Sequence, residues 1–203
     1  MNSIIIDKNN LSEIEFANVI QSLKDVDVLY VLPTYFRQSK QLLKKHNIKI
    51  GSLADYPLSQ STKGKVAFEI GRLFFEGVED ILLPLPFSYL KDFQQMQEYV
   101  KIMNPIAYGR GKVSFILPVR KLKELEKISL ARNLSKIGMT SIVLQCEAFD
   151  EALHTLDIFK MDGPRFLEIR IQLENIEDFQ REILLAQGAH SVITTYNENY
   201  DIL

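Results

Sequence analysis

Short apolar runs alternate with longer amphipathic runs along almost the whole chain. The short runs are apolar on both faces, which is typical of parallel strands that are covered on both sides. Eight runs of this kind are expected to be strands: Ser3–Asp7, Val28–Leu32, Lys49–Ala54, Asp80–Leu85, Lys112–Leu117, Ser141–Gln145, Phe166–Ile171 and Ser191–Thr195.

The segments between these strands carry apolar residues at the spacing of amphipathic helices. The clearest examples are the stripe that begins at Leu11, the segment from Lys65 to Phe75 and the segment from Leu122 to Ile137. By contrast, Asn104 to Gly111 contains Pro, Gly, Tyr and Arg and is expected to be a long surface loop.

Start and stop signals support the same division of the chain. Ser12 stands three residues before Glu15, which is the spacing of a capping box at a helix start. A glycine just before a strand is expected to cap the preceding helix. Three glycines have this position: Gly77, Gly138 and Gly188.

Eight strands that alternate with seven helices predict a compact (β/α)₈ TIM barrel made of a single domain, residues 1–203. A doubly wound open sheet is the alternative, because alternation alone does not close a barrel. After the last strand only Tyr196 to Leu203 remain, so the last helix is expected to be short or missing. Either a second subunit covers that position in a homodimer, or the last residues form a helical stub or a frayed tail.

Composition and charge exclude several classes of protein. The chain is 46% hydrophobic and 25% charged, and its net charge is −2, which argues against a general nucleic-acid or anionic-membrane surface. No apolar run approaches the roughly 20 residues of a membrane span, and the start lacks the pattern of a signal peptide. Cys146 is the one cysteine, so no internal disulfide is possible, and a cytoplasmic location is expected.

A resemblance to a known family begins in the second predicted strand. The run Leu-Tyr-Val-Leu-Pro-Thr-Tyr-Phe from Leu29 is similar to the Val-Cys-Val-Asn-Pro run that leads into a helix in deoxyribose-phosphate aldolases. The run Asp55-Tyr56-Pro57-Leu58 parallels the family's Gly-Phe-Pro, and Gly77-Val78-Glu79-Asp80-Ile81 follows at the family's spacing. Weaker agreement continues to Thr195. The resemblance implies a TIM barrel and a class I aldolase, which is a lyase that needs no cofactor.

The residues that such an aldolase needs are replaced in this chain. A class I aldolase requires an amine that forms a Schiff base, a proton relay and a second cation. The resemblance places the Schiff-base lysine at Val143, the aspartate at Leu82 and the second lysine at Glu168. The family's Gly-Gly phosphate loop corresponds to Ile171-Gln172. We therefore expect a pseudoenzyme, with no retro-aldol activity on deoxyribose 5-phosphate.

Polar side chains remain at the carboxyl ends of the predicted strands, where active sites of such barrels lie. The catalytic candidates are Asp7, Asp55 and Glu147, and the ligand-binding candidates are Arg120, Arg170, Thr194 and Thr195. The same rim is expected to carry Lys8, Thr34, Tyr35, Tyr56, Gln145, Cys146, Gln172, Glu174 and Tyr196.

The candidates for anion binding have a structural alternative. Arg170 with the hydroxyls of Thr194 and Thr195 would suit a phosphate or carboxylate on adjacent strands. Alternatively, Arg170 pairs with a neighbouring carboxylate, Glu168 or Glu174.

The acidic candidates and the cysteine also have purely structural interpretations. Asp7 and Asp55 would serve as acid and base or as ligands of a cation, or they cap the following loop or helix. Cys146 is expected to be a buried, inert thiol. The three histidines, His46, His154 and His190, are too dispersed to predict a metal site.

Three functions are compatible with this pattern. The first is a non-catalytic relative of the aldolases that binds a small phosphorylated or carboxylated ligand or a protein partner. The second is a lyase or isomerase that acts on such a small molecule through candidates named above. The third is an aldolase with a displaced lysine, for which only Lys8 and Lys112 lie near predicted strand ends. A barrel plugged by residues such as Leu82, Pro84, Leu117 and Val143 would weaken every small-molecule function.

Overall fold

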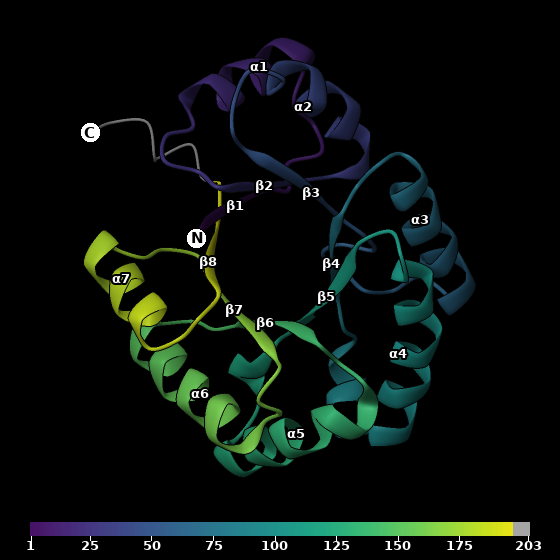
Figure 1. Cartoon of the computed structure of the whole chain (residues 1–203), viewed down its shortest axis with the longest axis vertical. Coiled ribbons are helices and arrows are strands. Elements are labelled where there is room, and N and C mark those ends of the chain that lie inside the picture. The colour runs from purple at the N-terminus through teal and green to yellow at the C-terminus, as the bar shows by residue number, and fades with distance from the viewer. Residues whose placement is uncertain (197–203) are drawn as a thin grey trace.

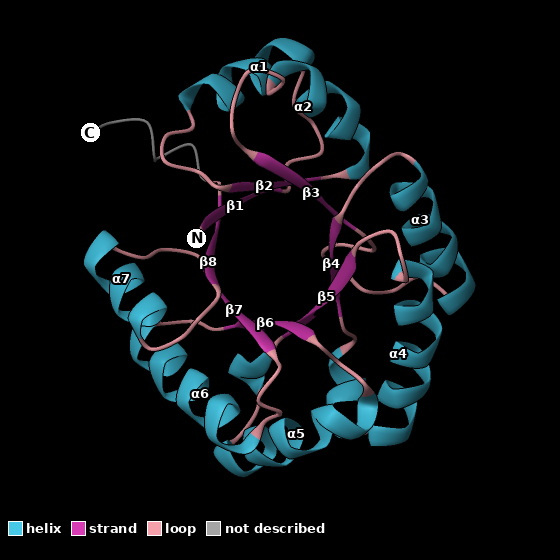
Figure 2. Cartoon of the chain, in the orientation of Figure 1, coloured by secondary structure: helices cyan, strands magenta, loops and turns pink. Residues whose placement is uncertain are grey.

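The computed structural model describes residues 1–196 (Figures 1 and 2). The elements follow in the order β1 (Asn2–Ile6), α1 (Glu13–Ser22), β2 (Val28–Val31), α2 (Phe36–Leu42), β3 (Lys49–Leu53), α3 (Lys63–Phe75), β4 (Asp80–Pro84), α4 (Phe93–Ala107), β5 (Lys112–Leu117), α5 (Glu124–Ile137), β6 (Ser141–Gln145), α6 (Phe149–Asp162), β7 (Glu168–Leu173), α7 (Asp178–Ala186) and β8 (Ser191–Thr195). Short 3₁₀ turns at Pro33–Tyr35, Phe87–Lys91 and Val119–Lys121 follow β2, β4 and β5.

The eight strands close into a parallel barrel in chain order, and the helices form a ring around it (Figure 1). Closure is made by β1 and β8, where Ser3 pairs with Ile193 and Ile5 with Thr195. This pairing confirms the (β/α)₈ barrel and excludes the open sheet. The predicted last helix would lie in residues 197–203, which are outside the described residues.

The predicted local signals are present. The Ser12 hydroxyl accepts from the Glu15 amide at 3.3 Å, and the Glu15 carboxylate accepts from the Ser12 amide at 2.7 Å, so the capping box is confirmed. Gly138 ends α5 in the left-handed conformation, with φ of 84°, as predicted for a C-terminal cap.

Two predicted boundaries are wrong. β7 begins at Glu168 rather than Phe166, because pairing with β6 starts there and the Phe166 side chain lies exposed before it. The loop predicted from Asn104 to Gly111 is right only for residues 108–111, because Asn104 to Ala107 form the last turn of α4, which contains Pro105. Burial of Met103 and Ala107 holds this turn against the barrel, and this packing outweighs the poor helix propensity of proline.

The apolar core has two parts. The larger part fills the space between the barrel and the helices, and it includes Leu117, which points outward from β5. The smaller part lies inside the barrel, and we call its central residues the middle layer: Ile5, Leu53, Leu82, Ile116, Val143 and Ile193. All six are at most 2% exposed, so aliphatic side chains fill the middle of the barrel. Of the residues named above for a plugged barrel, Leu82 and Val143 belong to this layer, whereas Leu117 does not.

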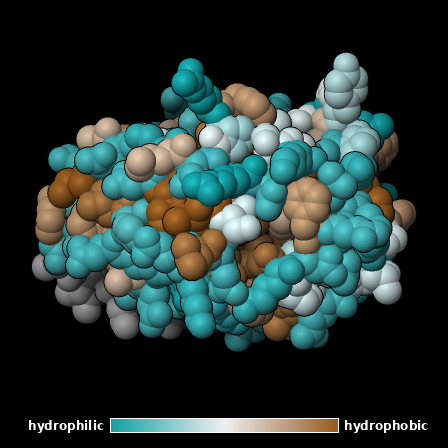
Figure 3. Space-filling model, turned by 90° about the horizontal axis from the view of Figure 1, so that it is seen from below, coloured by the Kyte–Doolittle hydropathy of each residue, from teal (hydrophilic) through white to brown (hydrophobic). Residues whose placement is uncertain are grey.

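The outer surface is mostly hydrophilic with separate apolar areas, as Figure 3 shows for the side of α5 and α6. In the described part of the chain, no helix combines the length and the apolar character that a bilayer crossing requires. A groove of about 530 Å³ lies beside β1 and β8, between the end of α1 and α7. Ile4, Lys24, Arg181 and Thr194 are among its lining residues.

Candidate functional site

A polar cavity of about 360 Å³ opens at the carboxyl ends of the strands, and we call it the C-terminal cavity. Residues at the ends of β1, β3, β5, β6, β7 and β8, or directly after these strands, meet in it. Its lining is Asp7, Lys8, Tyr56, Arg120, Gln145, Cys146, Gln172, Leu173, Glu174, Thr195 and Tyr196. Of the seven residues singled out from the sequence, the cavity thus brings together Asp7, Arg120 and Thr195.

The side chain of Gln172 is the least satisfied polar group of this cavity. It is only 5% exposed, and its Oε1 atom has no hydrogen-bond partner among the described residues. A buried amide oxygen without a donor is unfavourable by about 1–3 kcal/mol. A donor from solvent or from a ligand would remove this penalty.

Burial changes the acid–base behaviour of two neighbours of Gln172. It raises the pKa of the half-buried Asp7 carboxyl above its usual value. Burial, together with the negative charge of Asp7, also raises the pKa of the Tyr56 hydroxyl. Asp7 is therefore a carboxyl group whose protonated form is favoured by its surroundings, which is a property of general acids and bases.

The floor of the C-terminal cavity is aliphatic. Leu82 and Val143, where the sequence resemblance places the aspartate and the Schiff-base lysine of the aldolases, pack together in the middle layer and are fully buried. Neither side chain can form an imine or move a proton. Lys8 is the one lysine in the lining, and its Nζ lies 5.8 Å from the centre of the Tyr196 ring.

The other acidic candidates lie outside the cavity. The Asp55 carboxylate accepts from the Ser61 amide at 3.2 Å, and Asp55 itself has φ of 49°. It therefore braces the loop after β3, which is the capping alternative. Glu147 is exposed, and its amide donates to the Glu151 carboxylate at 2.8 Å.

Two further residues of the predicted rim, Thr194 and Cys146, are buried. Thr194 faces the side groove between α1 and α7 instead of the cavity. Cys146 lines the cavity, but burial raises the pKa of its thiol to about 12, so the sulfur stays protonated and unreactive.

Arg170 lies at the opposite end of the barrel from Thr195. Its Nη2 is 2.7 Å from Asp80 Oδ2, its Nε is 2.7 Å from Glu168 Oε1, and its Nη1 donates to the Tyr30 hydroxyl. The expected grouping of Arg170 with the two threonines is therefore wrong. β7 places Arg170 one layer below Gln172, and pairing with Glu168, the alternative weighed above, is what the structure shows.

Arg170 belongs to a group that we call the ion-pair layer: Tyr30, Asp80, Lys112, Glu168 and Arg170. Lys112 Nζ is 2.7 Å from Glu168 Oε1 and 3.5 Å from Asp80 Oδ2, and the Tyr30 hydroxyl donates to Asp80 at 2.9 Å. Burial opposes ionisation of Glu168, but Lys112 and Arg170 outweigh it and hold the pKa of Glu168 below its usual value. Lys112 is thus engaged in ion pairs.

Sequence reasoning missed the ion-pair layer, although a signal for it exists. Asp80, Lys112 and Glu168 each begin a strand. Leu82 stands two residues after Asp80, and Arg170 stands two residues after Glu168. Residues two apart share a face of a strand. In the described part of the chain, no group of three or more His, Cys, Asp or Glu side chains is arranged to hold a metal ion.

Comparison with known proteins gives a consistent family likeness. No family model matches the chain. A deoxyribose-phosphate aldolase of Clostridium kluyveri is 27% identical over 108 residues, which are 52% of this chain and 50% of that protein. The chain thus matches only about half the length of this relative.

Solved structures agree in fold. A Coccidioides immitis protein assigned as a deoxyribose-phosphate aldolase superposes with a TM-score of 0.80 at 11% identity, covering 95% of this chain and 80% of that one. The tetrameric deoxyribose-phosphate aldolase of Aeropyrum pernix gives a TM-score of 0.74 at 14% identity, covering 94% and 84%. At such identities the likeness shows the fold alone.

Proposed function

We propose that this chain, which resembles the deoxyribose-phosphate aldolases in sequence and fold, binds a small phosphorylated or carboxylated ligand in its C-terminal cavity without Schiff-base chemistry on β6. The single observation that carries the proposal is the unpartnered, buried amide oxygen of Gln172 in a polar cavity. Arg120 and Lys8 line the same cavity and supply positive charge for an anionic group.

The composition of the middle layer supports the proposed absence of imine chemistry. An imine requires a primary amine that reaches the carbonyl carbon of the substrate. Val143 occupies the family's lysine position and is fully buried among aliphatic neighbours. A substrate in the C-terminal cavity would meet a hydrocarbon floor where the aldolase presents a nucleophile.

A second candidate is a lyase or isomerase that uses Asp7. The raised pKa of its carboxyl group supports a role as general acid or base. Lys8, in the same cavity, is the one position from which an amine would reach a bound carbonyl compound.

Binding is tested by thermal shift and calorimetry with a panel of sugar phosphates and small carboxylates. We expect at least one to raise the melting temperature and to bind with a measurable Kd. Arg120→Ala should weaken this binding roughly tenfold, because a charge-assisted contact is lost. Arg132→Ala, on the outer face of α5, is the matched control and should leave the Kd unchanged. Unchanged affinity in Arg120→Ala would contradict the proposed location.

Imine chemistry is tested by borohydride reduction in the presence of deoxyribose 5-phosphate, followed by mass spectrometry. We expect no covalent adduct on any lysine. An adduct on Lys8 that disappears in Lys8→Arg would overturn the first function and support amine chemistry from the rim.

We further propose a homodimer that covers the side groove between α1 and α7. The groove exposes Ile4, on the outer face of β1, beside Lys24 and Asp178. Sedimentation velocity should then show a dimer that Ile4→Lys dissociates; a monomer at all concentrations would contradict it.

The cytoplasmic location and the single domain over residues 1–203 stay predictions from the sequence.

A further inference from the structure

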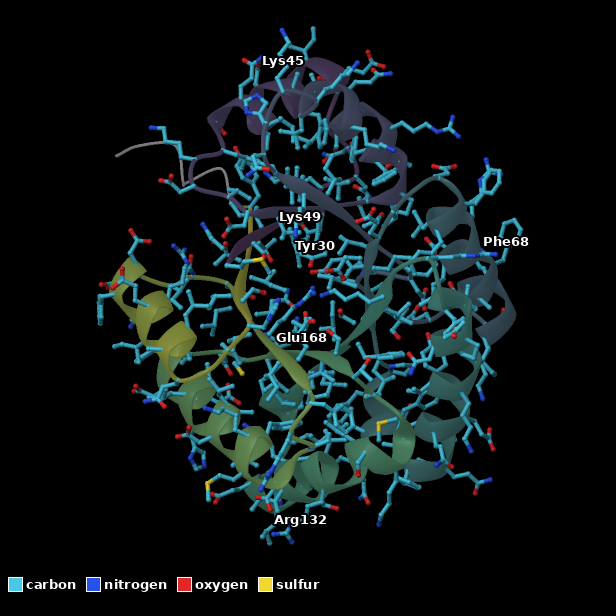
Figure 4. All side chains as sticks on the ribbon, in the orientation of Figure 1. Tyr30, Lys45, Lys49, Phe68, Arg132 and Glu168 are labelled. Atoms are coloured by element: carbon cyan, nitrogen blue, oxygen red, sulfur yellow. The ribbon has the colours of Figure 1, made fainter. Side chains whose placement is uncertain are left out.

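The barrel has a second cavity, at the amino ends of the strands, and we call it the N-terminal cavity. Its volume is about 830 Å³, so it is the larger of the two barrel openings. Its lining includes Val28, Phe36, Lys40, Ile48, Lys49, Gly51, Glu79, Asp80, Arg110, Lys112, Arg170 and His190. Figure 4 looks along the barrel and shows Tyr30 and Glu168 on opposite sides of the opening, with Lys49 close to Tyr30.

The lining of this cavity is rich in positive charge. Five cationic side chains and only two acidic ones belong to it. Lys112 and Arg170 are neutralised by Asp80 and Glu168 in the ion-pair layer. Lys49 and Arg110, at the rim, form no ion pair with any residue that the structure describes. The positive charges of Lys49 and Arg110 at the rim are therefore available to bind an anionic ligand.

Polar groups without partners lie in the same part of the barrel. Ser3 and Ser191 stand two residues before Ile5 and Ile193 of the middle layer, so their side chains share the interior face of the barrel. Both are at most 1% exposed, and neither hydroxyl has a hydrogen-bond partner among residues 1–196. Buried hydroxyls of this kind are usually satisfied by solvent or by a ligand.

One wall of the cavity is apolar. Phe36, Ile48 and Val28 line it, and Lys40 lies 5.5 Å from the centre of the Phe36 ring. Gly51, which also lines the cavity, lets the Tyr30 ring pack directly on the backbone of β3, because a Cβ atom there would lie 2.4 Å from that ring. The volume falls in the range of roughly 300–1,000 Å³ that is usual for small-molecule sites.

We propose that the N-terminal cavity is a second ligand site, which takes a phosphate monoester with an apolar or aromatic body. The dianionic phosphate lies between Lys49 and Arg110 above the ion-pair layer, and the apolar body packs on the wall formed by Phe36 and Ile48. The site is separate from the C-terminal cavity, because the middle layer lies between them.

The probes are phenyl phosphate, inorganic phosphate and phenol, and binding is measured by calorimetry on the full chain. Phenyl phosphate should bind more tightly than either of its parts, and its affinity should fall as salt is added. The double variant Lys49→Ala/Arg110→Ala should weaken phenyl phosphate binding roughly tenfold or more. Both side chains are exposed, so the fold should persist, and circular dichroism checks this.

Two control variants make the result specific. Lys45→Ala removes a lysine at the outer edge of the helical ring, well away from the cavity, and should leave the affinity unchanged (Figure 4). Arg120→Ala alters only the C-terminal cavity and should also have no effect. The proposal is overturned if wild-type protein binds no phenyl phosphate at millimolar concentration, or if Arg120→Ala abolishes binding and the double variant does not. Failure of the C-terminal ligand panel would leave this result unaffected.

Discussion

The two ends of the barrel use polar residues in opposite ways. At the amino end, the buried guanidinium of Arg170 is matched by two carboxylates and a tyrosine hydroxyl. At the carboxyl end, the buried amide of Gln172 keeps an oxygen that has no hydrogen-bond partner among residues 1–196. Both residues belong to β7 and are two positions apart, so the strand is the same and only the surroundings differ.

This difference suggests a division of roles, in which the paired residues at the amino end stabilise the fold and the unpaired group at the carboxyl end serves ligand binding. A buried charge persists only when it is paired, so the ion-pair layer is expected to hold the strands β4, β5 and β7 together. A buried polar group that is left unpaired lowers the stability of the fold, and a molecule that supplies the missing partner removes this cost. Three substitutions test this division.

The largest effect is expected from Arg170→Met. Loss of the guanidinium leaves the carboxylates of Asp80 and Glu168 with Lys112 as their shared cation, and with His190 3.7 Å from Glu168. This loss should lower the free energy of unfolding by roughly 3–5 kcal/mol. Urea denaturation measures it. Arg132→Met, which breaks an exposed pair with Asp162, is the control and should change stability by less than about 1 kcal/mol. Equal losses of stability in the two variants would show that the ion-pair layer stabilises the fold no more than an exposed ion pair does.

A smaller, pH-dependent effect is expected from Glu168→Gln. The pKa of Glu168 is lowered in the folded chain, so its contribution to stability is present above the unfolded pKa of about 4.3 and is lost as the pH falls through the folded value. Wild-type protein should therefore lose more stability between pH 6 and about pH 3 than the variant does. Denaturation curves at a series of pH values give the two slopes, and parallel slopes would show that Glu168 is not stabilised by its partners.

The smallest effect on stability is expected from Gln172→Leu. Removal of the amide oxygen, which has no donor among residues 1–196, relieves an unfavourable burial, but the same substitution removes the hydrogen bond between the Gln172 and Tyr56 side chains. These effects oppose each other, so the free energy of unfolding should rise by less than about 1 kcal/mol. The same variant should weaken binding of any ligand of the C-terminal cavity. A large loss of stability would contradict this division, because it would show that Gln172, like Arg170, stabilises the fold.

The sequence predicted the barrel well because its signals are local. The strands, the capping box at Ser12 and the cap at Gly138 depend on neighbours within a few residues. The errors occur where packing overrides those signals. The last turn of α4 forms around Pro105 because Met103 and Ala107 are buried beneath it.

The site was predicted less well, for a reason that lies in the strands. Strands buried on both faces do not alternate clearly between polar and apolar residues, so the sequence does not say which residues point into the barrel. Leu117 was expected inside and packs outside, and Arg170 was expected at the carboxyl end and lies at the amino end. An error of one layer along the barrel moves a side chain from one opening to the other.

The plugged middle of the barrel has a consequence for how its two openings behave. Six aliphatic side chains form a septum that neither water nor a small molecule crosses, so the openings are separate compartments that share a wall. Substitutions in one compartment leave the shape of the other intact as long as the septum holds. A chain built in this way is free to acquire a new specificity at one end while the other end keeps its own.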